Sequence, residues 1–293
     1  MNPTQIRHST TTSGFTRSDL VAALAGTFIL AAVALPAIGS SRNRSNQEVC
    51  SDNLRALMRA TQLYAEDHRD EFPMVTHGGD AQAGQPINYA NRSSNRPWVT
   101  GWLDWNPSPA NTNTAFLVDS RYAVLGGYTR DPRLYKCPSD TLLSGPQRAR
   151  GWTSRSRSYS ANGVIGRGNK APSDGLFNAE KFFYRFSDVD RPSPSQLYVF
   201  IEEHPDSIND GAILNSQLSL RWIDLPAAHH PTVSTNNSSN VVFVDGHVEN
   251  HAWQATVLAE RPNTIFSPPN VRTGDPDWAW LMDRTSYNRN AVR

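Results

Sequence analysis

The stretch that decides the fold is GFTRSDLVAALAGTFILAAVALPAIG, residues 14–39. A short polar leader ends at Gly14, Phe15 follows, Asp19 is acidic, and an uninterrupted apolar run comes next. That run has roughly the 20 residues that cross a bilayer as a helix. A secretory signal is cleaved after its apolar region, whereas the candidate cleavage site here precedes it. The order predicts a leader at 1–14 and a transmembrane helix at 15–44, with a plain signal anchor as the alternative.

A second helical pattern follows directly at residues 45–67. Apolar and small residues recur there at spacings of three and four, which predicts an amphipathic helix. The predicted buried face comprises Val49, Cys50, Asn53, Leu54, Leu57, Ala60, Thr61 and Tyr64. A continuous helix from Phe15 to Asp67 would be about 80 Å long. Half of it would lie in the membrane, and half would form the spine of the remaining domain.

The remainder, residues 68–293, reads as short strands between long loops. The best strand is 196–203, and the best hairpin is 240–251, where Asp245-Gly246 offers a tight primed turn. A helix followed by antiparallel strands predicts an α+β head at residues 45–293. The predicted fold is therefore a long N-terminal transmembrane and spine helix packed on an antiparallel sheet with long loops.

Composition excludes some classes of partner. With 28 Lys and Arg against 27 Asp and Glu, the formal net charge is +1. No global field therefore attracts nucleic acid, and none is expected as a partner. Eight tryptophans are present. Those from Trp98 to Trp105 can form either a platform for a sugar ring or part of the core.

Several polar residues could hold a cation. They combine carboxylate and amide oxygens, which suit calcium, with imidazoles, which suit zinc or another transition metal. The candidates are Glu203, His204, Asp206, Asn209, Asp210, His230, Asp245 and His247. The alternative is a hydrogen-bonded loop whose Asp and Asn side chains cap turns. No nucleophile elbow or phosphate loop is present, so no catalytic residue is assigned.

The N-terminal order Gly14, Phe15, Asp19 and apolar helix resembles type IV prepilins and the pseudopilins of type II secretion. Further motifs resemble the pseudopilin-like proteins of planctomycetes and verrucomicrobia that carry a C-terminal H-X9-DG segment. These motifs are Cys50 with Asn53-Leu54-Arg55, Phe72-Pro73, Cys137-Pro138-Ser139-Asp140, the segment 158–163, the segment 203–211, and the segment 243–248. The resemblance implies cleavage after Gly14 and N-methylation of Phe15 by a prepilin peptidase. It also implies that Asp19 pairs with the Phe15 amine of a neighbouring subunit during assembly.

The resemblance further implies an inner-membrane, single-pass protein whose head lies in the periplasm. That compartment permits a disulfide between Cys50 and Cys137, with two buried free thiols as the alternative. The implied function is a non-enzymatic subunit of a periplasmic pseudopilus for protein secretion, with other pseudopilins as partners. No cofactor is required, and calcium is the first candidate because some pseudopilins hold it. The rival functions are an anchored carbohydrate-binding module and a metal-dependent hydrolase.

Overall fold

The computed structural model describes residues 16–18, 20, 21, 24, 45–78, 97–166, 180–219, 221–230, 237–254 and 269–288. The chain divides into two units, Met1–Arg44 and Ser45–Arg293. The second unit corresponds to the expected head. The second unit begins at Ser45.

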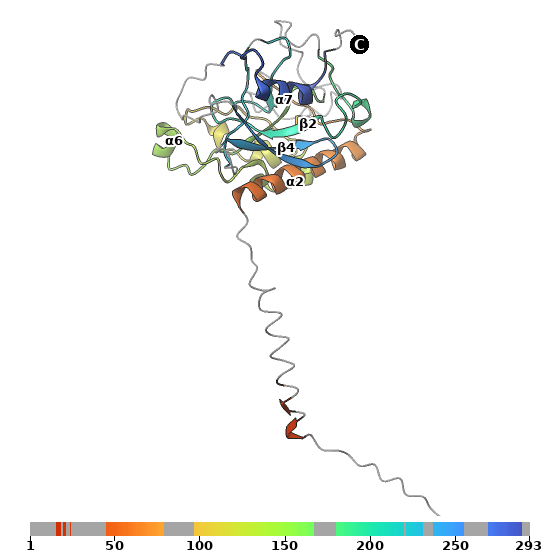
Figure 1. Cartoon of the computed structure of the whole chain (residues 1–293). Helices are drawn as coiled ribbons and strands as arrows, with labels where there is room; N and C mark the ends of the chain where they lie inside the picture. The colour runs from red at the N-terminus through yellow and green to blue at the C-terminus, as the bar shows by residue number, and fades with distance from the viewer. Residues whose placement is uncertain are drawn as a thin grey trace, which may run out of the picture. The chain divides into compact units, whose positions relative to one another are not determined.

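The first element of the head is helix α2, Asn46–Asp67 (Figure 1). Ser45 is its N-cap, with an extended backbone at φ −63° and ψ 150°. The Ser45 hydroxyl accepts a hydrogen bond from the Glu48 amide at 3.2 Å, and the Glu48 carboxylate accepts one from the Ser45 amide at 2.9 Å. This capping box satisfies two amides that would otherwise lack partners. The expected continuous helix from Phe15 to Asp67 is therefore wrong, because the chain is extended at Ser45.

No helix among the described residues is long and apolar enough to cross a membrane. This finding overturns two expectations, the transmembrane helix at residues 15–44 and the single-pass inner-membrane location. Most of that segment, together with Gly14, Phe15 and Asp19, lies outside the described residues.

One five-stranded sheet forms the centre of the head, in the order β3-β1-β2-β4-β5. The strands are β1 Tyr159–Asn162, β2 Tyr198–Glu202, β3 Ala212–Ile213, β4 Ser238–Phe243 and β5 Val248–Ala252. Neighbours are antiparallel except β1 and β3, which pair in parallel through Ala161 with Ala212. The expectation of a purely antiparallel sheet is thus corrected to a mixed one.

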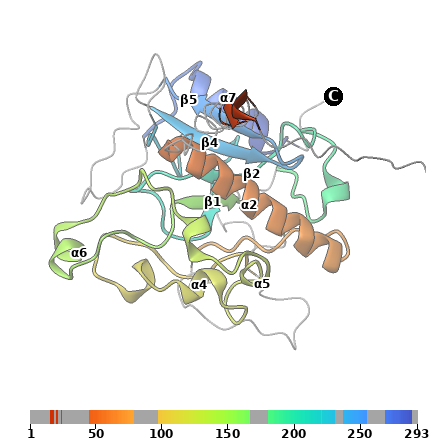
Figure 2. The same ribbon diagram turned by 90° about the horizontal axis from the view of Figure 1, so that it is seen from below.

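Helices cover the two faces of this sheet. Helix α2 lies across one face, and α7, Pro276–Thr285, lies over the other (Figures 1 and 2). Each face has its own apolar cluster: Leu54 and Leu57 belong to the α2 side, and Leu281 and Met282 to the α7 side. The periodic face of α2 is buried as predicted apart from Val49, which is half-buried. Apolar burial on both faces is the main stabilising term of such a layered domain.

Short helices and turns connect these elements. They are η1 Pro109–Asn111, α4 Ala115–Val118, α5 Gly126–Thr129, η2 Pro132–Tyr135, α6 Gly145–Ala149 and η3 Phe186–Asp188. In the hairpin between β4 and β5 the Gly246 amide donates to the Phe243 carbonyl at 2.9 Å. Only Gly246 has a positive φ there, 93°, so the turn is not the primed type expected at Asp245-Gly246.

Candidate functional site

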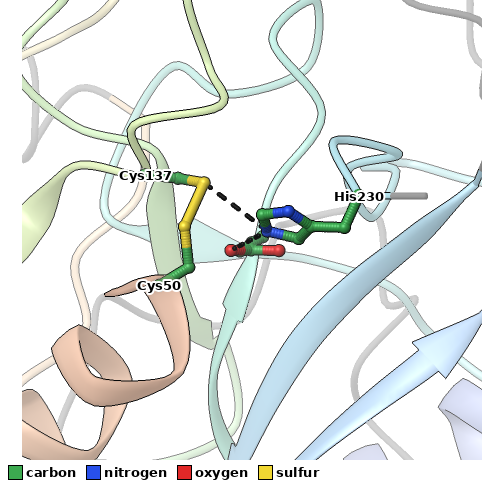
Figure 3. Close-up of side chains that lie close together, drawn as sticks. Cys50, Cys137 and His230 are labelled. Atoms are coloured by element: carbon green, nitrogen blue, oxygen red, sulfur yellow. Dashed lines mark hydrogen bonds and ion pairs between the residues drawn. A yellow bond between two sulfur atoms is a disulfide. The ribbon is translucent and has the colours of Figure 1, made fainter. Parts of the chain in front are cut away.

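A buried cluster of sulfur, imidazole and carboxylate groups lies between α2 and the sheet (Figure 3). Helix α2 supplies Cys50, the segment after η2 supplies Cys137, and β2 ends at Glu202. His230 comes from the segment before β4 and pairs through its backbone with Ser238. The ligand atoms of the four side chains lie within 4.8 Å of one another, and all four side chains are buried. Four distant parts of the sequence thus meet at one point.

The two cysteines are joined by a disulfide whose Cα atoms are 5.2 Å apart. That separation lies within the usual range for a disulfide. His230 faces this bond, with its Nε2 3.6 Å from Cys137 Sγ (Figure 3). The same Nε2 lies 3.0 Å from Glu202 Oε1. The imidazole therefore bridges the sulfur pair and the carboxylate.

Neighbouring residues hold the Glu202 carboxylate and the His230 imidazole in place. Glu202 Oε2 accepts a hydrogen bond from the Asn240 backbone amide at 2.8 Å. On the other side of the imidazole, Ser139 Oγ lies 3.5 Å from His230 Nδ1. Glu202 is 0% exposed and His230 is 1% exposed. A buried carboxylate and imidazole with fixed partners form a preorganised site, because neither side chain has to reorient.

The loop after β2, residues 203–211, uses its polar groups to hold itself together. Asp206 Oδ1 accepts from Trp105 Nε1 at 2.9 Å, and Asn209 Oδ1 accepts from the Asp210 amide at 2.6 Å. His204 Nδ1 accepts from the Asp206 amide at 3.2 Å. Among the described residues, the four-residue cluster at the disulfide is the only group of three or more potential ligands within such distances. The polar side chains of this loop are thus engaged in hydrogen bonds with neighbouring residues.

Two buried carboxyls of this loop, Glu203 and Asp210, form an acidic group with Asp224. Glu203 accepts a hydrogen bond from the Ser207 hydroxyl at 2.9 Å, and Asp210 accepts from the Ala212 amide at 2.9 Å. Burial raises the pKa of Glu203 to about 8 and also raises the pKa of Asp210. Burial, followed by the charges of Glu203 and Asp210, raises the pKa of Asp224 well above its ordinary value. Burial thus favours the protonated form of these carboxyls more than water does.

The hairpin residues Asp245 and His247 form a pair of their own. Their Oδ1 and Nδ1 atoms are 2.6 Å apart, and both side chains are exposed. The His247 amide also donates to Asp245 Oδ1 at 3.1 Å, which is the local bond expected of an Asx turn. Of the predicted ligands, only His230 therefore belongs to the cluster at the disulfide. Glu202, which the sequence reasoning missed, replaces its neighbour Glu203.

A cavity of about 540 Å³ lies next to the disulfide. Its walls include Val49 and Asn53 of α2 and the two neighbours of Cys137, Lys136 and Pro138. Lys136 Nζ donates to Asp140 Oδ2. The cavity is thus lined by chain neighbours of both cysteines, while the cysteines themselves are buried behind it.

Lys136 also acts on the buried carboxyl of Asp140. Burial opposes ionisation of this carboxyl, but the charges of Lys136, His229 and Arg155 outweigh it and hold the pKa of Asp140 below its usual range. Asp140 in turn accepts a hydrogen bond from the Ser158 hydroxyl at 2.7 Å. The segment after Cys137 is thus fixed to the start of β1 by a charged group.

The tryptophan-rich stretch is divided between the interior and the surface, since Trp98 is buried while Trp102 and Trp105 are half-buried. Trp98 is 0% exposed, stacks on Tyr135 and donates from Nε1 to the Gly211 carbonyl at 2.8 Å. Trp105 lies under the Arg155 guanidinium, whose central carbon is 4.1 Å from the ring centroid. Both indoles are used in packing, which favours the core reading over the sugar-binding platform.

Searches against protein-family models, curated proteins and solved structures found no match for this chain.

Proposed function

We propose that the chain is a pilin-like subunit, not an enzyme, that joins a protein filament through its N-terminal segment. The observation that carries the proposal is the position of α2. The head begins with this helix, whose apolar face packs across a mainly antiparallel sheet. A helix packed on the sheet of the head is the part of the expected pilin-like arrangement that supports the proposal. The proposal concerns processing and assembly and includes no membrane-spanning helix.

The proposed partners are a prepilin peptidase and further pilin-like subunits. The peptidase would cut between Gly14 and Phe15 and methylate the new amine. Asp19 would then pair with the Phe15 amine of the adjacent subunit, because a desolvated carboxylate needs a partner of opposite charge. All three residues lie outside the described part of the chain, so their roles rest on the sequence.

The first test is the mass of the mature N-terminus in chain purified from its native cells. The expected result is a start at N-methylated Phe15. Gly14→Val should block processing, because the small residue before the cut is replaced by a branched one. A native chain that begins at Met1 would refute the processing step.

The second test is chemical crosslinking of the full chain in the same cells. Asp19→Ala should reduce crosslinked multimers, while Asp19→Glu should keep them because the carboxylate is retained. Asp283→Ala is the matched control, because it removes an exposed carboxylate from α7. If Asp19→Ala and Asp283→Ala give equal multimers, the proposed assembly contact is wrong.

A further inference from the structure

We propose that reduction of the Cys50–Cys137 disulfide converts the buried cluster into a site for a thiophilic divalent metal ion such as Zn²⁺. The ligands would be the two cysteine thiolates, His230 Nε2 and one oxygen of Glu202. The site therefore exists in two alternative forms, a disulfide or a metal centre. This inference is independent of filament assembly.

The four proposed ligands are of the types that bind zinc. Two thiolates, one imidazole and one carboxylate are ligands that Zn²⁺ accepts in tetrahedral sites. The ligand atoms already lie within 4.8 Å of one another. His230 Nε2 is 3.0 Å from Glu202 Oε1 and 3.6 Å from Cys137 Sγ. Zinc lies about 2.0–2.3 Å from such ligands, so a metal ion bound among them needs only small side-chain shifts after the sulfur–sulfur bond opens.

The outer partners suit the metal-bound form. When Nε2 binds a metal, the imidazole proton resides on Nδ1, where Ser139 Oγ is the neighbouring acceptor at 3.5 Å. Glu202 keeps Oε2 on the Asn240 backbone amide at 2.8 Å, while Oε1, now 3.4 Å from the Asn240 side-chain nitrogen, would bind the metal. Histidine ligands usually donate their second ring N–H to such an outer group, which fixes the tautomer. The cluster thus contains both the ligands and the groups that orient them.

The chemical steps balance. An added phosphine takes up the oxygen of water and is oxidised to its phosphine oxide, and its two electrons cleave the sulfur–sulfur bond to give two thiols. Binding of the metal ion then releases the two thiol protons. The cavity lined by Val49, Lys136 and Pro138 is the described pocket whose walls include sequence neighbours of both cysteines. A newly made chain meets reducing conditions in the cytosol, where disulfides are rare.

The test uses the full, tag-free chain, reduced by a phosphine without oxygen and titrated with Co²⁺ and then Zn²⁺. The reduced chain should bind one Co²⁺ with thiolate-to-metal charge transfer and the visible bands of tetrahedral Co²⁺. One Zn²⁺ should displace it. The oxidised chain is the first control. It has the same sequence but no thiolates, so neither the charge-transfer signal nor the visible bands of tetrahedral Co²⁺ should appear.

Variants separate the four-ligand site from plain thiol binding. His230→Gln and Glu202→Gln should each weaken Zn²⁺ binding by more than about 100-fold, since even the loss of an outer partner costs about 10–100-fold. His247→Gln is the matched control, because it changes an exposed histidine in the hairpin. Unchanged affinity in His230→Gln, or no tetrahedral Co²⁺ spectrum in the reduced wild type, overturns the proposal.

If the reduced chain unfolds, the metal itself provides the readout. Zn²⁺ should then restore the native circular dichroism of the reduced wild type but not of reduced His230→Gln, because binding to the native state stabilises it. Failure of Zn²⁺ to refold the reduced wild type would overturn the proposal as well.

Discussion

Reducing the Cys50–Cys137 disulfide is expected to lower the free energy of unfolding by about 2–4 kcal/mol. The bond joins residues 87 positions apart. The chain-entropy relation for a loop of that length gives roughly 15 cal/mol/K, or about 4.6 kcal/mol at 25 °C, as the upper value, and most disulfides contribute about 2–4 kcal/mol. In this loop-closure account, reduction acts by removing a constraint on the unfolded chain.

The assay is urea denaturation of the full chain followed by tryptophan fluorescence, with and without a phosphine reductant. EDTA is present in both samples, so that the proposed metal site cannot stabilise the reduced form. With a slope of about 3 kcal/mol/M, the midpoint should fall by about 1 M.

Cys50→Ala/Cys137→Ala is the control, because its midpoint should not respond to the reductant. A wild-type loss below about 1 kcal/mol would refute the loop-closure reasoning.

Three further predictions concern the core, the helix cap and pH. Trp98→Ala should cost about 3–5 kcal/mol of unfolding free energy, because a buried indole and its bond to the Gly211 carbonyl are lost; a urea midpoint close to that of the wild type would contradict this. Ser45→Ala should cost about 1 kcal/mol and Ser45→Gly only a few tenths, in the same assay; equal losses would argue against the cap. Burial, followed by nearby carboxylates, raises the pKa of Asp224 above 3.8, so the folded chain binds this proton more tightly than the unfolded chain does. The contribution of Asp224 to stability is therefore complete below about pH 3.8 and is lost as the pH rises through the folded pKa. Urea midpoints measured across this pH range should show that Asp224→Asn removes part of the loss. The exposed control Asp283→Asn should leave the loss unchanged.

Helix α2 was predictable because its signals are local, whereas the longer helix expected from Phe15 to Asp67 was not found. Spacings of three and four identified the buried face, and the predicted end at Asp67 is the observed one. The start required a further signal that the sequence also carries. Ser45 and Glu48 stand three residues apart before an apolar run, which is the pattern of a capping box. Given more weight, that pattern would have predicted that the helix begins after Ser45.

Strand β3 and helix α7 were not predicted, for two different reasons. Strand β3, Ala212–Ile213, has two residues and exists because it pairs with β1, so no periodicity marks it. Helix α7 was missed although Asp275-Pro276 is a typical helix start, with the aspartate as N-cap and proline at the first position. Strand β3 could not be predicted because it depends on tertiary pairing. Helix α7 could have been predicted from its N-terminal residues.

The candidate site was partly predictable. His230 and the two cysteines were singled out from the sequence, but their meeting point depends on strand order, which brings positions 50, 137, 202 and 230 together. Whether Glu202 or Glu203 belongs to the cluster depends on which face of the sheet each side chain points toward. Successive residues of a strand point to opposite faces, so Glu202 faces the disulfide while Glu203 bonds Ser207. A register shift within β2, between Tyr198 and Phe200, makes that parity hard to count from the sequence.

The disulfide also determines how the head would respond to mechanical load. A pull on the chain at Ser45 reaches Cys50 within the first turns of α2, and there a covalent bond passes the force directly to Cys137. The residues between the two cysteines carry no tension, so stretching from both ends cannot extend them. Reduction would release this loop, whose ends are 87 positions apart, and would add about 300 Å of contour length at roughly 3.3–3.6 Å per position. Oxidation state therefore sets how far this protein can be drawn out before its chain is fully extended.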